Sequence, residues 1–270
     1  MTTHFVTFAS NGFEGNANRL LESADRCGFG AVHRVGLDDI ADTDFARRNR
    51  DILSAQRGGG YWLWKPYILR EFVGRLRDGE ILLYSDAGRS TYYEFSRFPA
   101  HLLERAAQSE QGFLAGVTIP HLGPIGKWTK RDCLQIMEAD NPNFYNKPVV
   151  QATWSVWTKS KSALNFLDNW LGYCEDPRCL TDAPNVLGKN NLPYFVDHRH
   201  DQSICSILAH KLSAPFLDFS GSRVQGALEL RPDSELGNTF YKRAQNSNDM
   251  LGKAGPSILL REYLRLRSLR

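Results

Sequence analysis

The sequence predicts an α/β layered fold with a mainly parallel central sheet and helices on both of its faces. The main observation is that predicted strands and helices alternate through roughly the first half of the chain, which is typical of such a sheet. In addition, the 270 residues are 42% hydrophobic, which is ample for a large core. No linker interrupts the pattern, so we expect one domain over residues 1–270.

The first elements follow the chain in strand–helix order. Residues 4–10 (HFVTFAS) form an apolar run that ends in small and polar residues, which predicts a first strand. Residues 15–28 carry apolar side chains at helical spacing, and Gly28 is placed as the stop signal of a helix. Residues 31–36 fit a second strand. Residues 44–56 are expected to be helical until three consecutive glycines interrupt them.

Residues 61–76 (YWLWKPYILREFVGRL) predict an amphipathic helix. Their apolar side chains recur at steps of three and four: Tyr61, Trp64, Ile68, Leu69, Phe72, Val73 and Leu76. Pro66 belongs in the first turn, where the missing N–H group costs little. Residues 80–88 (EILLYSDAG) then predict the next strand.

The second half of the chain is less regular. Residues 113–119 predict a strand, 129–140 a helix, and 148–160 one or two strands followed directly by a helix. Asp201 starts a further helix with an apolar stripe, which consists of Ile204, Cys205, Leu208 and Leu212. Residues 218–256 are polar and predict a loop-rich cap.

Composition restricts the class of protein. The net charge of +3 argues little for a nucleic-acid partner, which usually needs a denser basic patch. The five cysteines are odd in number and form no CxxC pair, which favours reduced thiols over disulfides or structural zinc. The first residues do not look like a signal peptide, and no apolar run is long enough to cross a bilayer. We therefore expect a cytoplasmic protein.

Asp86 is the first candidate functional residue. It follows an apolar strand, and ligands of open α/β sheets bind beyond the carboxyl ends of the strands. Ala87 and Gly88 leave room beside it. A carboxylate in this place suits a divalent cation that bridges two phosphates. The alternative is a turn or helix cap, for which Asp is also common.

This strand-end acid, together with the later Asp201–Gln202 pair that opens a helix, resembles GT-A glycosyltransferases of the bacterial polysaccharide-biosynthesis type. Those enzymes have a Rossmann-like GT-A domain, in which a DxD motif holds a metal and the diphosphate of a nucleotide sugar. Here only the second acid is present, and Tyr84 stands in place of the first. The resemblance implies that Mn²⁺ or Mg²⁺ binds at Asp86, although the missing acid leaves the need for metal open.

The resemblance also assigns roles to further residues. It implies donor binding by two segments and one lysine: Phe8, Ala9 and Ser10; Tyr84, Ser85, Asp86, Ala87 and Gly88; and Lys65 of the Trp-rich helix. It implies an acceptor side made of Gln151, Trp154 and His200. Asp201 and Gln202 face the reacting sugar in retaining members of the superfamily, so they are the catalytic candidates.

Each of these residues also has a structural alternative. Asp201 is well placed as a helix N-cap, and Lys65 as a solvated helix residue. His198 and His200 are either metal ligands beside Asp201 or ordinary loop residues. Core packing is the commoner fate of tryptophan, and we expect at least one of Trp62 and Trp64 in the core.

The leading hypothesis is a glycosyltransferase that moves a sugar from a nucleotide sugar to a glycan or lipid-linked acceptor, with retention favoured, in surface polysaccharide synthesis. One rival is a nucleotidyltransferase, which would carry a Gly-rich loop with Lys or Arg directly after the first strand; here no Lys or Arg precedes Arg19. Another is a non-catalytic carbohydrate-binding protein. Residues 256–270 predict a basic helix that either contacts an anionic membrane or docks on the domain.

Overall fold

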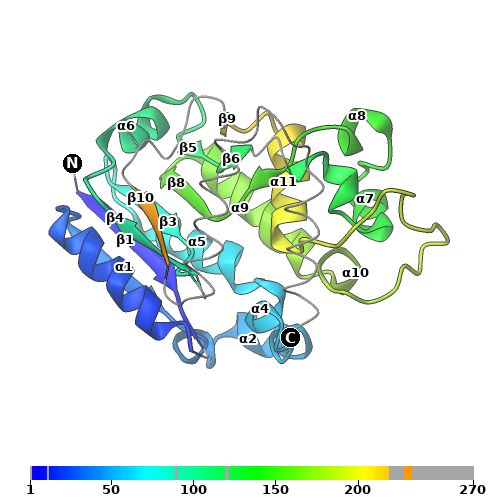
Figure 1. Ribbon diagram of the computed structural model, residues 1–270, viewed down its shortest axis with the longest axis horizontal. Coiled ribbons are helices and arrows are strands. Elements are labelled where there is room, and N and C mark those ends of the chain that lie inside the picture. Colours follow the sequence, from blue (N-terminus) through cyan, green and yellow to red (C-terminus); the bar gives the residue numbers. More distant parts are fainter. Residues whose placement is uncertain (1, 11, 89–90, 119–121, 219–227, 233–270) are drawn as a thin grey trace.

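A five-stranded sheet organises the computed structural model, which describes residues 2–10, 12–88, 91–118, 122–218 and 228–232 (Figure 1). The strand order is β2 (Ala31–Val35), β1 (Thr3–Phe8), β3 (Ile81–Ser85), β8 (Trp154–Thr158) and β5 (Phe113–Leu114). β1 pairs in parallel with β2 and β3, whereas β8 is antiparallel to both of its neighbours. Only β8 therefore runs against the others, and the predicted mixed α/β class with a mostly parallel sheet is confirmed.

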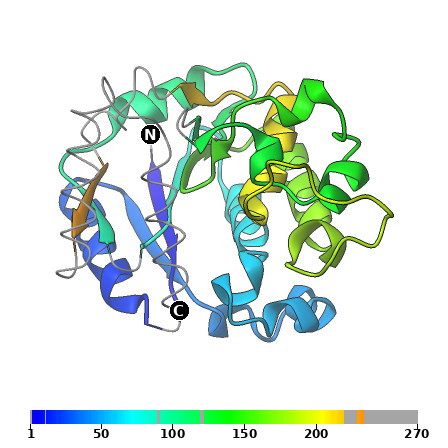
Figure 2. The same cartoon turned by 45° about the vertical axis from the view of Figure 1, so that its right-hand side comes forward.

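Helices cover both faces of this sheet, as predicted (Figure 2). On one face, α1 (Glu14–Arg26) and α6 (Ala100–Gln108) bury Leu20 and Leu103 against Phe5 and Leu83. On the other face lie α5 (Trp64–Arg75), α9 (Lys161–Cys174) and α11 (Asp201–Lys211). Because side chains of a strand alternate between faces, Leu83 joins the first core and Tyr84 the second.

Shorter elements complete the described part of the chain. The remaining helices are η1 (Asp38–Ile40), α2 (Asp44–Arg48), α3 (Arg50–Leu53), α4 (Gly58–Tyr61), η3 (Ile125–Lys127), α7 (Arg131–Ile136), α8 (Pro142–Tyr145) and α10 (Pro177–Leu180). β7 (Val150–Gln151), β6 (Val117–Thr118) and β9 (Leu217–Asp218) form a three-stranded sheet, and β4 (Thr91–Phe95) pairs with β10 (Leu228–Pro232).

Three predicted elements differ from the structure. The helix expected from residue 61 begins at Trp64, because Tyr61 and Trp62 have positive φ angles of 55° and 61°. The helix expected over 44–56 is broken at Asn49 into α2 and α3. The strand expected over 113–119 is split into β5 and β6, which belong to different sheets. Pro66 does lie in the first turn of α5, as predicted.

Other predictions concern residues outside the described part of the chain. The basic helix over 256–270 lies there entirely, as does most of the cap over 218–256. The assignment of the whole chain to one domain stays a prediction. All five cysteines are free, as predicted. Across the described ranges, no helix has the length and apolar character needed to span a bilayer.

Candidate functional site

The site lies where the parallel strands β1 and β3 end side by side. Val6 of β1 is in register with Tyr84 of β3, so the residues after both strands emerge at one edge of the sheet. Just beyond them, Ala9 and Ala87 pack in a single small cluster with Ala17 of α1. The two segments predicted to bind the donor are therefore neighbours in space.

The start of α5, in the Trp-rich segment, contacts this edge of the sheet through aromatic stacking. The ring of Phe8 stacks on that of Trp64 with centroids 3.6 Å apart. The Trp64 indole N–H group donates to the carbonyl oxygen of Gly58, 2.9 Å away, and thereby ties α5 to the glycine turn. Trp64 is buried, which confirms the prediction that at least one of Trp62 and Trp64 belongs to the core.

Asp86 follows β3 directly and is held by groups on either side of it. Its backbone N–H donates to the carbonyl oxygen of Thr153, 2.8 Å away. The Tyr84 hydroxyl group donates a short hydrogen bond to Asp86 Oδ1. The Asp86 side chain nevertheless keeps 30% of its surface exposed. Asp86 thus presents a carboxylate to solvent in a fixed orientation.

Lys65 connects Asp86 to Asp201. Its Nζ atom lies 3.1 Å from Asp86 Oδ1, 3.1 Å from Asp201 Oδ2 and 3.3 Å from the carbonyl oxygen of Ala152. The side chains of Lys65 and Asp201 are both buried, whereas that of Asp86 is not. The structure therefore brings together the Trp-rich helix, the strand-end acid and the Asp–Gln segment, which lie far apart in the sequence.

Burial governs the ionisation of these groups. Burial and the nearby Asp86 charge raise the pKa of Asp201 to about 6, against the opposing effect of Lys65. Burial alone would lower the pKa of Lys65, but the two carboxylates outweigh it and raise that pKa. Burial and Asp86 also raise the pKa of Tyr84. At neutral pH the site thus holds an ammonium, a protonated phenol and ionised Asp201.

The side-chain oxygens of Asp86 fit one kind of metal site. Among the described residues, no group of three or more His, Cys, Asp or Glu side chains is arranged to hold a metal ion. Asp86 Oδ1 is engaged by Tyr84 and Lys65, but the side chain is partly open to solvent. A single carboxylate fits Mg²⁺ or Mn²⁺ that takes its other ligands from substrate phosphates and water.

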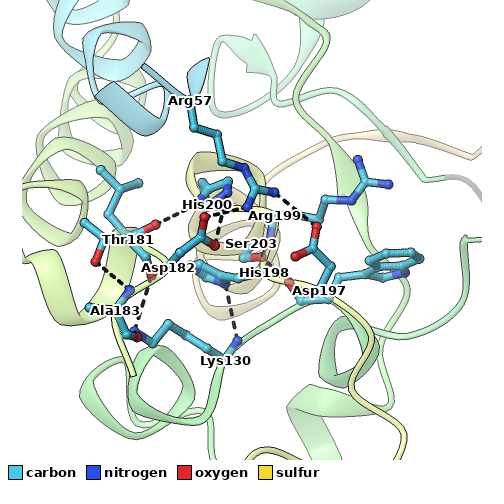
Figure 3. Close-up of polar contacts among 12 residues, drawn as sticks. Arg57, Lys130, Thr181, Asp182, Ala183, Asp197, His198, Arg199, His200 and Ser203 are labelled. Atoms are coloured by element: carbon cyan, nitrogen blue, oxygen red, sulfur yellow. Dashed lines mark hydrogen bonds and ion pairs between the residues drawn. The ribbon is translucent and has the colours of Figure 1, made fainter. Parts of the chain in front are cut away.

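A second polar network lies around the start of α11 (Figure 3). The Arg57 guanidinium pairs with Asp182 and, at 3.1 Å, with Asp197. Asp182 Oδ1 in turn lies 3.8 Å from His200 Nε2, and His200 Nδ1 lies 2.7 Å from the carbonyl oxygen of Leu180. We call Arg57, Asp182, Asp197 and His200 the Arg57 network. It fastens both ends of residues 182–197 to the turn that precedes α5.

His200 occupies an unusual backbone conformation at the junction between the two parts of the site. Its φ angle is 52°, and it directly precedes Asp201 at the start of α11. Its ring packs against Tyr61 and Trp62, with centroids 4.9 Å and 5.6 Å away. Strain of this kind in a non-glycine residue is common at functional sites. The turn fixes the direction in which Asp201 enters the site.

His198 and the nearby Lys130 have structural partners. His198 Nδ1 accepts a hydrogen bond from the backbone N–H of Lys130 at 3.3 Å (Figure 3). His198 Nε2 lies 2.7 Å from the carbonyl oxygen of Cys179. Burial, followed by the nearby His200, lowers the pKa of His198 well below its usual value. The Lys130 ammonium donates to the carbonyl oxygens of Thr181 and Ala183. Both rings of the His-x-His segment are therefore buried among protein groups.

The predicted acceptor residues are placed unevenly. Trp154 is buried in the core beneath α1 and α6, because β8 turns Trp154 and Val156 to that face. The structure does not bring its side chain to the Asp86 side of the sheet. His200 is buried as well, whereas Gln151 in β7 and Gln202 in α11 are half-buried. Their part in acceptor binding and catalysis stays a prediction.

Of the Arg57 network, only His200 is a candidate from the sequence, whereas Arg57, Asp182 and Asp197 are not. Asp182 and Asp197 stand in an irregular segment with no periodic pattern, so nothing local distinguishes them from solvated loop residues. Arg57 offers a weak signal, since it directly precedes three glycines. Only the folded chain shows that these residues meet.

Comparisons of the sequence find no match, whereas a comparison of structures does. No family model matches this sequence, and no curated protein matches it. A solved structure of apo mouse xyloside xylosyltransferase 1 is similar, with a TM-score of 0.44 and 10% identity over 81% of this chain and 84% of that chain. That neighbour is a glycosyltransferase by its description. Similarity this distant does not transfer residue roles or activity to the present chain.

Proposed function

We propose that this protein is a glycosyltransferase that uses a nucleotide-sugar donor and a hydroxyl-bearing acceptor, either a glycan or a lipid-linked sugar. The observation that carries the proposal is the bridge made by Lys65 between Asp86 and Asp201. It joins an acid at the ligand-binding edge of the sheet to a buried acid at the start of α11.

Each acid suits one requirement of glycosyl transfer. The departing nucleoside diphosphate carries concentrated negative charge, and a cation at Asp86 would neutralise part of it when bound. Asp201 is ionised above a pH of about 6, so near neutral pH it is able to accept a proton from an acceptor hydroxyl or to stabilise a positively charged sugar. The resemblance of the Asp–Gln segment to retaining enzymes favours the second role.

The ends of β1 and β3 supply the place for the nucleotide. Phe8, Ala9 and Ser10 leave β1 beside Ala87, and Gly59 lies close to them, since a Cβ added to it would be 3.7 Å from Ser10 Oγ. Small residues and glycine backbone permit close approach of a ligand. A role in surface polysaccharide synthesis rests on the sequence resemblance and extends this proposal.

The test is a thermal-shift screen with UDP, GDP, ADP and CDP, each with and without Mn²⁺, followed by hydrolysis assays on the matching nucleotide sugars. We expect one nucleotide to raise the Tm and its sugar derivative to be hydrolysed. Asp86→Ala and Asp201→Ala should reduce that hydrolysis. Binding without hydrolysis or transfer by any donor would instead support a non-catalytic binding protein.

A further inference from the structure

We propose that Lys65 is a positioning residue: its ammonium group holds Asp86 and Asp201 at one fixed separation and makes no contact with the donor diphosphate. The inference rests on the proposed function in so far as it names the diphosphate. It assigns Lys65 a different role from that of a cation that binds phosphate.

The number of partners around Lys65 supports this role. An ammonium group has three N–H donors and no acceptor. Three oxygen atoms surround Lys65 Nζ within 3.3 Å, and they belong to Asp86, Asp201 and Ala152. A phosphate oxygen would have to displace one of them.

The net charge of Lys65, Asp86 and Asp201 also argues against a contact between Lys65 and the diphosphate. One ammonium between two ionised carboxylates leaves a net negative charge, which repels a diphosphate. The same charge attracts a divalent cation to the open side of Asp86. Lys65 is therefore suited to keeping the buried Asp201 close to the partly exposed Asp86, because the two negative charges would repel each other without it.

Lys65 is itself held from several directions. Nζ lies 5.8 Å from the ring centroid of Trp64 and 5.5 Å from that of Tyr84. Trp64 is fixed by its stack on Phe8 and its bond to Gly58. The ammonium thus lies near two aromatic rings that are buried in the core, and these rings help to fix its position beside both acids.

The first experiment measures whether Lys65 and Asp201 are coupled, without any ligand. We expect Lys65→Met to lower the Tm by about 10 °C, because it leaves buried charge unpaired. Asp201→Asn added to that variant should recover part of the loss. Lys130→Met is the matched control, because Lys130 is a buried lysine bonded to backbone carbonyls and not to a carboxylate. It should show no coupling to Asp201→Asn. Additive losses for Lys65 and Asp201 would overturn the proposal.

The second experiment separates positioning from phosphate binding. UDP, GDP, ADP and CDP are titrated into the wild-type protein, the Lys65→Met variant and the Lys65→Met/Asp201→Asn variant, in EDTA and then in Mn²⁺. In EDTA, we expect Lys65→Met to change the Kd by less than about threefold, whereas the gain in affinity from Mn²⁺ should be lost. A Kd about tenfold weaker in EDTA would show that Lys65 binds the diphosphate and would overturn the proposal.

The two proposals fail in different ways. If no nucleoside diphosphate binds the wild-type protein under either condition, the proposed function fails. The stability cycle between Lys65 and Asp201 then still decides whether Lys65 holds the acids. If Lys65→Met alone does not fold, a folded Lys65→Met/Asp201→Asn variant still shows the coupling. A double variant that also fails to fold, beside a folded Asp201→Asn variant, would overturn the proposal.

Discussion

The Tyr84 hydroxyl group donates a hydrogen bond to Asp86 Oδ1, two residues further along the chain. The tyrosine ring is buried in the core, so its hydroxyl group has a fixed position. Asp86 is therefore oriented by a neutral hydrogen-bond donor from its own strand. This arrangement leaves Asp86 with one oxygen engaged inside the protein and its side chain partly open to solvent.

Removal of that hydroxyl group should affect the site more than the fold. We expect Tyr84→Phe to cost about 1 kcal/mol of unfolding free energy, because one hydrogen bond is lost while the ring stays packed. Nucleotide-sugar hydrolysis should fall by about tenfold, since Asp86 loses its fixed orientation. Steady-state kinetics and chemical denaturation measure the two effects. Tyr67→Phe is the control, because the Tyr67 ring stacks on Phe45 away from Asp86. Equal losses in both variants would contradict the prediction.

Metal and nucleotide should stabilise the protein only together. Of the two acids bridged by Lys65, Asp86 alone is partly exposed, and one carboxylate is too few ligands for a divalent cation without substrate phosphates. We expect Mn²⁺ alone to leave the Tm unchanged, and Mn²⁺ with a nucleoside diphosphate to raise it by several degrees. At a ligand concentration a hundredfold above Kd, binding adds about 2.7 kcal/mol to the free energy of unfolding.

The same assay has a matched pair of variants. Asp86→Asn should abolish the joint effect of metal and nucleotide. Asp168→Asn should preserve it, because Asp168 pairs with Arg70 on the surface between α5 and α9. A full response in the Asp86→Asn variant would show that the metal binds elsewhere.

The pH dependence of the reaction should report Asp201. Because burial raises the pKa of Asp201 to about 6, the ionised form that catalysis needs becomes abundant only above that pH. We expect kcat/KM to rise with pH through about 6 and then level off, as measured across a buffer series. If kcat/KM of the wild-type protein is constant between pH 5 and pH 7, the ionisation of Asp201 does not control the reaction.

The free energy of unfolding should change with pH in the direction opposite to that of kcat/KM. The folded protein binds the Asp201 proton more tightly than the unfolded chain does, so protonation favours the fold. This contribution is complete below the unfolded pKa near 4 and is lost as pH rises to about 6. The unfolding free energy of the wild-type protein, relative to Asp201→Asn, should therefore fall by a few kcal/mol over that range. A difference that rises with pH would contradict the assignment.

The glycine turn before α5 should tolerate no side chain at Gly60. Its φ angle is 92°, and an added Cβ would lie 2.7 Å from Leu53 Cα, which is backbone and does not move aside easily. We expect Gly60→Ala to lower the unfolding free energy by about 2 kcal/mol or more. Gly74→Ala is the control in the same region, because Gly74 lies inside α5 with only the Arg70 side chain near its added Cβ.

The two glycine variants should therefore change the free energy of unfolding in opposite directions. Gly74→Ala should raise the stability by about 0.5–1 kcal/mol, because alanine is the better helix residue. Denaturant unfolding of both variants measures the difference. Equal stabilities would show that the turn rearranges without cost and no longer constrains Trp64 and Lys65.

Several features of the site could be predicted from the sequence because they are local. An apolar run that ends at Asp86, a Trp-rich helix and an acid at the start of a later helix are each visible within a few residues. Parallel pairing of the first and third strands follows from the helices between them, and it places Phe8 and Asp86 at one edge of the sheet. Asp201 and Lys65 are candidates through the resemblance to GT-A glycosyltransferases, which depends on these local segments.

The tertiary structure alone decided how these residues act together. The ammonium of Lys65 is held by three oxygens from separate segments, and no local pattern encodes which oxygens will surround it. The same holds for the Arg57 network, whose acids lie in an irregular segment. Trp154 shows the reverse case, since its side chain was expected at the acceptor side and the pleat of β8 turned it into the core. Secondary structure follows from the spacing of neighbouring residues, whereas the partners of a buried charge depend on how distant segments pack around it.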